Sequence, residues 1–141
     1  MASLIAILLT MVLLLLSVLH VFWAFGGRWG ISAVIPIVEK SSQRLFTPPP
    51  VVTLAVAMAL LVASLLVLLR ADILGVMLPN WIPRLGVWSL AIVFALRAIG
   101  DFRYVGFFKR VRNTTFARMD TQFYTPLCVV LAVLAGLVGL W

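Results

Sequence analysis

Four long apolar runs divide the chain, and most charged residues lie in the segments between them. A helix needs about 20 apolar residues to cross the hydrocarbon core of a bilayer. We therefore predict membrane spans at about 4–25, 51–69, 85–108 and 122–141. Three prolines precede the second run, where the first helical turn needs no donated N–H group. The pattern predicts an all-α integral membrane four-helix bundle that forms one domain over residues 1–141.

The fourth run contains Pro126 close to its start. A helix that began at this proline would be only about 24 Å long at 1.5 Å per residue, which is short for a bilayer. We therefore expect the helix to start near Gln122 and to bend, or the membrane to become thinner around it.

Composition supports the membrane class. The 141 residues are 65% hydrophobic and 11% charged, with a mean hydropathy of +1.22. Soluble domains are about 45–50% apolar and about 25% charged. The first run has no positive residues before it and no small-residue cleavage site after it, so we interpret it as a retained span. The single cysteine, Cys128, excludes an intramolecular disulfide and a cysteine metal cluster, and we expect no metal site.

Basic residues predict the orientation of the chain. Those that follow the first and third runs are Arg28, Lys40, Arg44, Lys109, Arg110, Arg112 and Arg118. Arg70 and Arg84 lie on the other side. Short basic loops mark the cytoplasm, so we expect both termini to be extracytoplasmic in a multi-pass protein of a bacterial inner membrane. The formal net charge of +7 indicates attraction to anionic lipid rather than to nucleic acid.

The third run contains an acid and two bases. Arg97 and Asp101 are four residues apart and would share one helix face, on which Tyr104 also lies. If Lys109 marked the interface, Arg97 would lie about 18 Å deep, and an arginine at that depth needs a partner. Alternatively, the span ends at Gly100. Asp101 would then be unburied on an amphipathic surface helix, and the span would be short.

Polar residues on two other runs reach a similar depth. We therefore predict a polar pocket in the cytoplasmic half of the bundle. The candidate catalytic residues are His20 and Asp101. The candidate ligand-binding residues are Trp23, Arg97, Tyr104 and Tyr124. Asp120 is predicted to cap the fourth helix. Purely structural roles also fit these residues: an ion pair for Arg97 and Asp101, an interhelical hydrogen bond for His20, and an interfacial anchor for Trp23.

Three motifs carry a resemblance to a known family. They are HVFWAFGGRWG (20–30), LRAIGDFRYVGFFKR (96–110) and FARMDTQFYTPLC (116–128). In this combination the chain resembles, over nearly its whole length, a family of small bacterial membrane proteins catalogued only as a domain of unknown function. The resemblance implies a four-span topology and no particular chemistry.

Three functions are compatible with these features, and none identifies a reaction or a cofactor. The first is a pocket protein that binds a lipid-like or amphipathic small molecule from the cytoplasmic leaflet, with or without catalysis. The second is an accessory subunit of a larger membrane complex, or a homo-oligomer, bound through small-residue faces such as Ala55, Ala59 and Ala63. The third is a proton-coupled carrier.

Overall fold

The computed structural model describes residues 2–30, 34–36 and 47–141, and its long elements are all helices. They are α1 (Ala2–Ala24), α3 (Pro50–Arg70), α4 (Trp81–Ile99), α5 (Thr115–Met119), the π-helical turn η1 (Asp120–Tyr124) and α6 (Thr125–Leu140). Four helical segments are long and apolar enough to cross a membrane, the fourth being continuous from Thr115 to Leu140. The predicted four-helix membrane fold is therefore confirmed. Lys40 and Arg44 lie outside the described residues.

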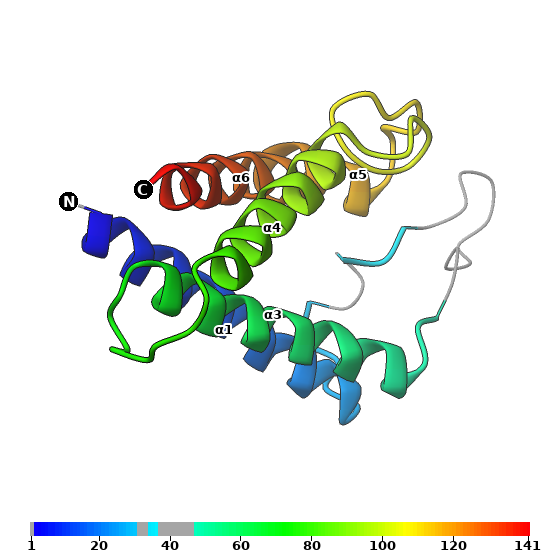
Figure 1. Ribbon diagram of the computed structural model, residues 1–141. Coiled ribbons are helices and arrows are strands. Elements are labelled where there is room, and N and C mark those ends of the chain that lie inside the picture. Colours follow the sequence, from blue (N-terminus) through cyan, green and yellow to red (C-terminus); the bar gives the residue numbers. More distant parts are fainter. Residues whose placement is uncertain (1, 31–33, 37–46) are drawn as a thin grey trace.

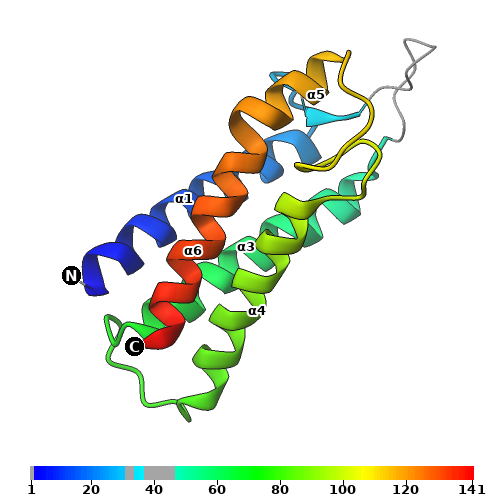
Figure 2. The same ribbon diagram turned by 90° about the horizontal axis from the view of Figure 1, so that it is seen from above.

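The two termini lie at the same end of the molecule, as four crossings require (Figure 1). The loops that carry Arg28 and residues 100–114 lie at the opposite end (Figure 2). The location of the termini outside the cytoplasm remains a prediction.

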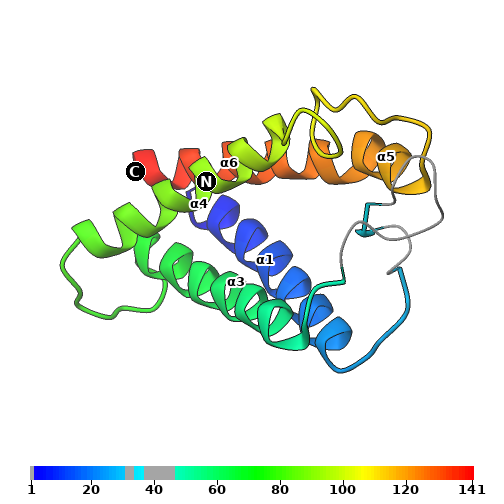
Figure 3. The same cartoon turned by 90° about the vertical axis from the view of Figure 1, so that its right-hand side faces the viewer.

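The helices pack as two pairs, α1 with α3 and α4 with α6, and the pairs converge at the end of the termini. Their shared core is formed by Ala6, Leu9, Leu13, Val67, Val87, Ala91, Leu131, Ala135 and Val138. Most of these residues belong to the half of their helix nearest the termini, and Ala91 and Leu131 lie near the middle of α4 and α6. Figure 3 shows the pairs diverging toward the other end. Within the α1–α3 pair, the Ser17 hydroxyl donates a hydrogen bond of 2.8 Å to the Ala57 carbonyl.

Helix α4 starts earlier and ends much earlier than the predicted span of 85–108. It covers Trp81–Ile99 and is followed by Gly100, whose φ of +87° only glycine adopts readily. The 19 residues correspond to about 28 Å of helix, which matches a bilayer core. Arg97 thus lies only about 3 Å from the end of the helix. The alternative prediction is confirmed in its helix end at Gly100 and in the exposure of Asp101, but residues 100–114 form a loop and not an amphipathic helix.

The fourth spanning helix starts at Thr115, well before the predicted start near Gln122. The Thr114 side chain caps it by accepting a hydrogen bond from the Ala117 N–H group at 3.1 Å. The wide π-helical turn directly precedes Pro126. Because proline lacks an N–H group and its ring clashes with the carbonyl of residue i−4, it does not fit the interior of a regular α-helix. The wide π-helical turn therefore allows the helix to continue through Pro126.

Candidate functional site: a buried carboxylate beside a basic pocket

Asp120 lies at the centre of a buried ion cluster. Its side chain is fully buried, and its Oδ1 accepts a hydrogen bond of 2.9 Å from Arg97 Nη2. Its Oδ2 accepts one of 2.8 Å from Lys109 Nζ and one of 2.9 Å from the Gly106 N–H group. A carboxylate removed from water needs such partners, since burying an unpaired charge is very costly. Asp120 therefore connects α4, the loop 100–114 and the fourth spanning helix.

Two glycines allow the loop to fold back onto the end of α4. Gly100 and Gly106 both have a φ of +87°. A Cβ atom on Gly106 would lie 2.6 Å from the Cα of Gly100 and would also clash with the Ile99 carbonyl. This close approach lets the Phe107 N–H group donate to the Ala98 carbonyl at 2.9 Å. The folded-back loop also carries Lys109, whose ammonium group bonds to Asp120.

Asp101 is exposed and does not pair with Arg97, so the predicted Arg97–Asp101 pair is wrong. The reason is that the helix ends before Asp101, which removes the i, i+4 geometry. Its Oδ1 instead accepts hydrogen bonds of 2.7–2.9 Å from the N–H groups of Arg103, Tyr104 and Val105. Partial burial raises the pKa of Asp101, but these N–H groups stabilise the carboxylate and hold the pKa below its ordinary value. Asp101 therefore organises the turn of the loop.

The π-helical turn determines which side chains of the fourth spanning helix share a face. In an α-helix, residues five apart are rotated by about 140° from each other. The wider turn brings Asp120 and Thr125 to one side, and both are fully buried. Asp120 is thus a central ion-pair residue rather than the helix cap that we predicted.

The remaining predicted residues do not join this cluster. His20 Nδ1 donates to the Leu16 carbonyl at 2.7 Å, and its ring packs edge-on against Trp23 at 5.2 Å. Trp23 Nε1 donates to the carbonyl of Trp29 at 2.9 Å. Both side chains belong to the end of α1, which diverges from α4 (Figure 3). The structure therefore does not bring His20 to Arg97.

The two predicted tyrosines form no hydrogen bond with the Asp120 carboxylate. The Arg103 guanidinium lies 5.2 Å from the centre of the Tyr104 ring. Tyr124 packs against Phe116 with 6.3 Å between ring centres. Both tyrosines are half-buried.

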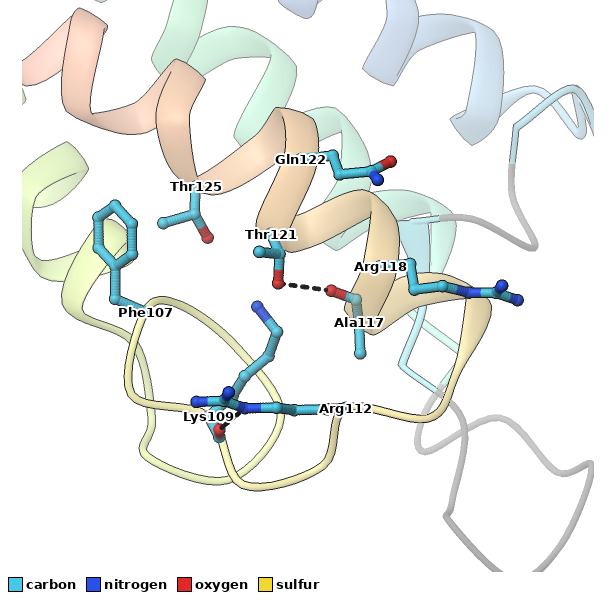
Figure 4. Close-up of a pocket in the computed structure, with 8 residues that line it drawn as sticks. All are labelled: Phe107, Lys109, Arg112, Ala117, Arg118, Thr121, Gln122 and Thr125. Atoms are coloured by element: carbon cyan, nitrogen blue, oxygen red, sulfur yellow. Dashed lines mark hydrogen bonds between the residues drawn. The ribbon is translucent and has the colours of Figure 1, made fainter.

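A pocket of about 410 Å³ opens beside the ion cluster (Figure 4). Its lining combines three cations, three uncharged polar side chains and two apolar ones: Lys109, Arg112, Arg118, Thr121, Gln122, Thr125, Phe107 and Ala117. In Figure 4 the Lys109 ammonium points toward the hydroxyl groups of Thr121 and Thr125. We call this site the basic pocket. None of the predicted ligand-binding residues lines it.

Several polar groups at the site have unused hydrogen-bonding capacity. The Thr125 hydroxyl and Arg97 Nη1 are buried and have no hydrogen-bond partner among the described residues. Lys109 Nζ gives two of its three protons to the Gly106 carbonyl and Asp120 Oδ2, at 3.0 and 2.8 Å. Within the described ranges, no group of three or more His, Cys, Asp or Glu side chains could hold a metal ion.

One signal in the sequence could have revealed the ion cluster. Gly100 comes three residues after Arg97, and glycine is the commonest residue just beyond a helix end. A helix that ends there excludes the local helical pair and leaves Asp120 as the other carboxylate close to the same membrane boundary. The basic pocket had no comparable signal, because its residues look like an ordinary positive cytoplasmic loop.

Comparison with known proteins gives a family but no activity. A search of curated proteins and a search of solved structures each found no significant match. One family model matches residues 13–135, which include all three motifs quoted above. The match covers most of the chain and agrees with the resemblance found in the sequence. The chain belongs to the DUF3995 family, described as a protein of unknown function.

Proposed function

We propose that this membrane protein binds a lipid-like, amphipathic molecule from the cytoplasmic leaflet, with the polar head of that molecule in the basic pocket. The observation that carries the proposal is the pocket itself, where three cationic side chains and a buried, unpaired hydroxyl surround about 410 Å³. Ligand sites in proteins commonly enclose about 300–1,000 Å³ and contain a few convergent polar groups.

The surroundings of the pocket favour an amphipathic ligand over a fully soluble one. The pocket adjoins the start of a membrane-spanning helix. Three exposed aromatic side chains, Phe102, Phe107 and Phe108, project from the loop beside it. Exposed aromatic rings next to basic residues are typical of a membrane interface, where the rings contact lipid and the cations remain hydrated. A ligand with a charged head and apolar chains matches both environments.

Retention and competition of lipids test this function. The full-length protein is purified in mild detergent, incubated with defined lipids and examined by native mass spectrometry. We expect saturable retention of one anionic lipid per chain, and we expect Arg118→Gln to reduce it because this exposed arginine lines the pocket. The matched control is Arg110→Gln, which removes one exposed cation from the neighbouring loop 100–114, outside the pocket lining. Equal retention by the wild type and both variants would refute the proposal.

A second candidate function is that of a subunit in a membrane complex. Of the three alanines predicted to form a small-residue face, Ala55 and Ala59 are exposed on α3, whereas Ala63 is half-buried and packs against the core. An unoccupied small-residue face allows close approach of another membrane helix. Cysteine crosslinking from Ala59→Cys in native membranes tests this candidate, with Met58→Cys, also exposed on α3, as the control position. Crosslinks of equal yield from both positions would count against a specific helix contact.

A further inference from the structure

We infer that the basic pocket recognises a phosphomonoester group, the terminal phosphate of a lipid head. The inference rests on the proposed function and deepens it by naming the chemical class of the head. A phosphomonoester carries about 1.5 to 2 negative charges near neutral pH and presents three acceptor oxygens in a tetrahedral arrangement. The charge, the donors and the geometry of the pocket each match that group.

The charge balance of the buried cluster leaves room for a second anion. Asp120 contributes one negative charge, and both of its oxygens are already occupied. Arg97 and Lys109 contribute two positive charges to it. Lys109 is buried, with a side chain only 3% exposed, so water compensates little of its charge. The cluster therefore carries one net positive charge. Water at Arg97, whose side chain is 34% exposed, compensates part of this charge, and an anion in the basic pocket would compensate the remainder.

The burial of Lys109 is not explained by a role in a positive cytoplasmic loop. The rule that positive loops stay in the cytoplasm depends on the number of Lys and Arg residues near the spans, and not on burying any of them. Arg110, Arg112 and Arg118 are exposed and satisfy that rule. A lysine ammonium binds phosphate as a point charge, and Lys109 Nζ has one proton left after its bonds to the Gly106 carbonyl and Asp120.

One hydroxyl group supplies the second match. The Thr121 hydroxyl gives its only proton to the Ala117 carbonyl at 3.0 Å and is therefore not a donor to the pocket. The Thr125 hydroxyl has no partner within the described part of the chain, although the side chain is fully buried and lines the pocket. Leaving a buried hydroxyl unpaired costs about 1–3 kcal/mol. A ligand oxygen that accepts its proton removes this cost, which makes Thr125 a candidate ligand-binding residue.

The number and spread of the lining donors favour a tetrahedral anion over a carboxylate. Lys109 and Thr125 are buried, whereas Arg112, Arg118 and Gln122 are exposed, and Figure 4 shows the Arg118 and Gln122 side chains extending away from the Lys109 ammonium. These long side chains would turn inward on binding, and three phosphate oxygens offer them more acceptor directions than the two oxygens of a carboxylate. Guanidinium groups match phosphate oxygens with two parallel hydrogen bonds.

The test compares four probes with the full-length protein in detergent, using native mass spectrometry and ligand-induced thermal stabilisation. They are phosphatidic acid (a phosphomonoester), phosphatidylglycerol (a phosphodiester), oleic acid (a carboxylate) and inorganic phosphate. We expect phosphatidic acid to bind at least tenfold more tightly than each of the other three. Comparable or tighter binding of phosphatidylglycerol or oleic acid overturns the phosphomonoester inference but leaves the proposed function standing. Binding of inorganic phosphate as tight as that of phosphatidic acid supports the head chemistry and refutes a lipid source. No binding of any lipid refutes both.

Thr125 provides the matched variants. Thr125→Val removes only a hydroxyl that has no partner in the described structure, so the fold should keep its stability. We expect it to weaken phosphatidic acid about tenfold, the equivalent of one hydrogen bond to a charged group. Thr125→Ser keeps the hydroxyl and should remain within about twofold of the wild type. Equal affinity of the Val and Ser variants would show that the hydroxyl does not touch the ligand and would overturn this part of the inference.

Discussion

Asp120→Asn provides the sharpest test of the ion cluster. The carboxylate accepts three hydrogen bonds, from Arg97, Lys109 and Gly106. The asparagine side chain keeps one oxygen, so it accepts from only one side. Its NH₂ group must then face either Arg97 or the Lys109–Gly106 pair. On that side two hydrogen-bond donors would face each other with no acceptor between them.

The expected cost follows from these contacts. Hydrogen bonds to charged groups contribute about 1.5–3 kcal/mol each, and the variant loses at least the bond to Lys109 or the one to Arg97. Breaking a buried ion pair by removing one partner costs about 3–5 kcal/mol. Because Arg97 is 34% exposed, it can turn toward water, whereas Lys109 at 3% cannot. We therefore expect a loss of about 3–5 kcal/mol in the free energy of unfolding, mostly from Lys109.

Reversible unfolding in mixed detergent micelles, followed by circular dichroism, measures this loss. The control is Asp72→Asn, which makes the same chemical change at an exposed site outside the helices. A double variant with Lys109→Met should be less destabilised than the sum of the two single variants, since the unpaired ammonium is also removed. A loss below about 1 kcal/mol for Asp120→Asn, or strictly additive effects in the double variant, would refute the argument that the buried pair holds the loop.

Three further outcomes follow from the structure. Gly106→Ala should destabilise the protein more than Gly75→Ala in thermal melts, because both glycines have positive φ but only Gly106 faces backbone atoms; equal shifts would contradict the close contact. The pKa of Asp101 is lower in the folded protein than its ordinary value of 3.8, so the ionised carboxylate stabilises the fold at pH values above 3.8. This contribution to stability disappears as the pH falls through the lowered pKa of the folded state. Melting curves of the wild type and Asp101→Leu should therefore differ at pH 7 and converge in acid, and a constant difference would contradict the assignment. Ser17→Ala should lower the unfolding free energy by about 0.6 kcal/mol, the typical loss of an interhelical hydrogen bond in a membrane, and an unchanged value would argue against the α1–α3 contact.

The spanning helices could be predicted from the sequence because apolar length alone determines them. The runs that became α1 and α3 end within two residues of their predicted limits. The third run could not be placed in the same way. Hydropathy treats residues 100–108 as a continuation of the helix, whereas Gly100 ends the helix through its backbone conformation. Gly100 is a local signal of such an end, and a span that ends there was the alternative prediction, but hydropathy alone could not choose between the two spans.

The site was harder to predict for a related reason. Arg97 was expected to find its partner one helical turn away, since local pairs are the ones that spacing can show. Its actual partner, Asp120, lies 23 residues along the chain and faces Arg97 only because the loop reverses and the helix widens. Lys109 and Thr125 were hidden for the same reason. A positive loop and a threonine near a proline have ordinary explanations until their neighbours in space are known.

The wide turn before Pro126 also has a consequence for motion. A π-helical turn contains one residue more than an α-helical turn, and this surplus residue shifts the faces of the helical segments before and after it relative to each other. Arg118 precedes the turn and Thr125 follows it, although both line the same pocket. A molecule that bridges them would resist any migration of the surplus residue along the helix. Without such a molecule, the surplus residue could move by one position and rotate Asp120 away from Lys109. Occupancy of the pocket and the register of the helix would then depend on each other.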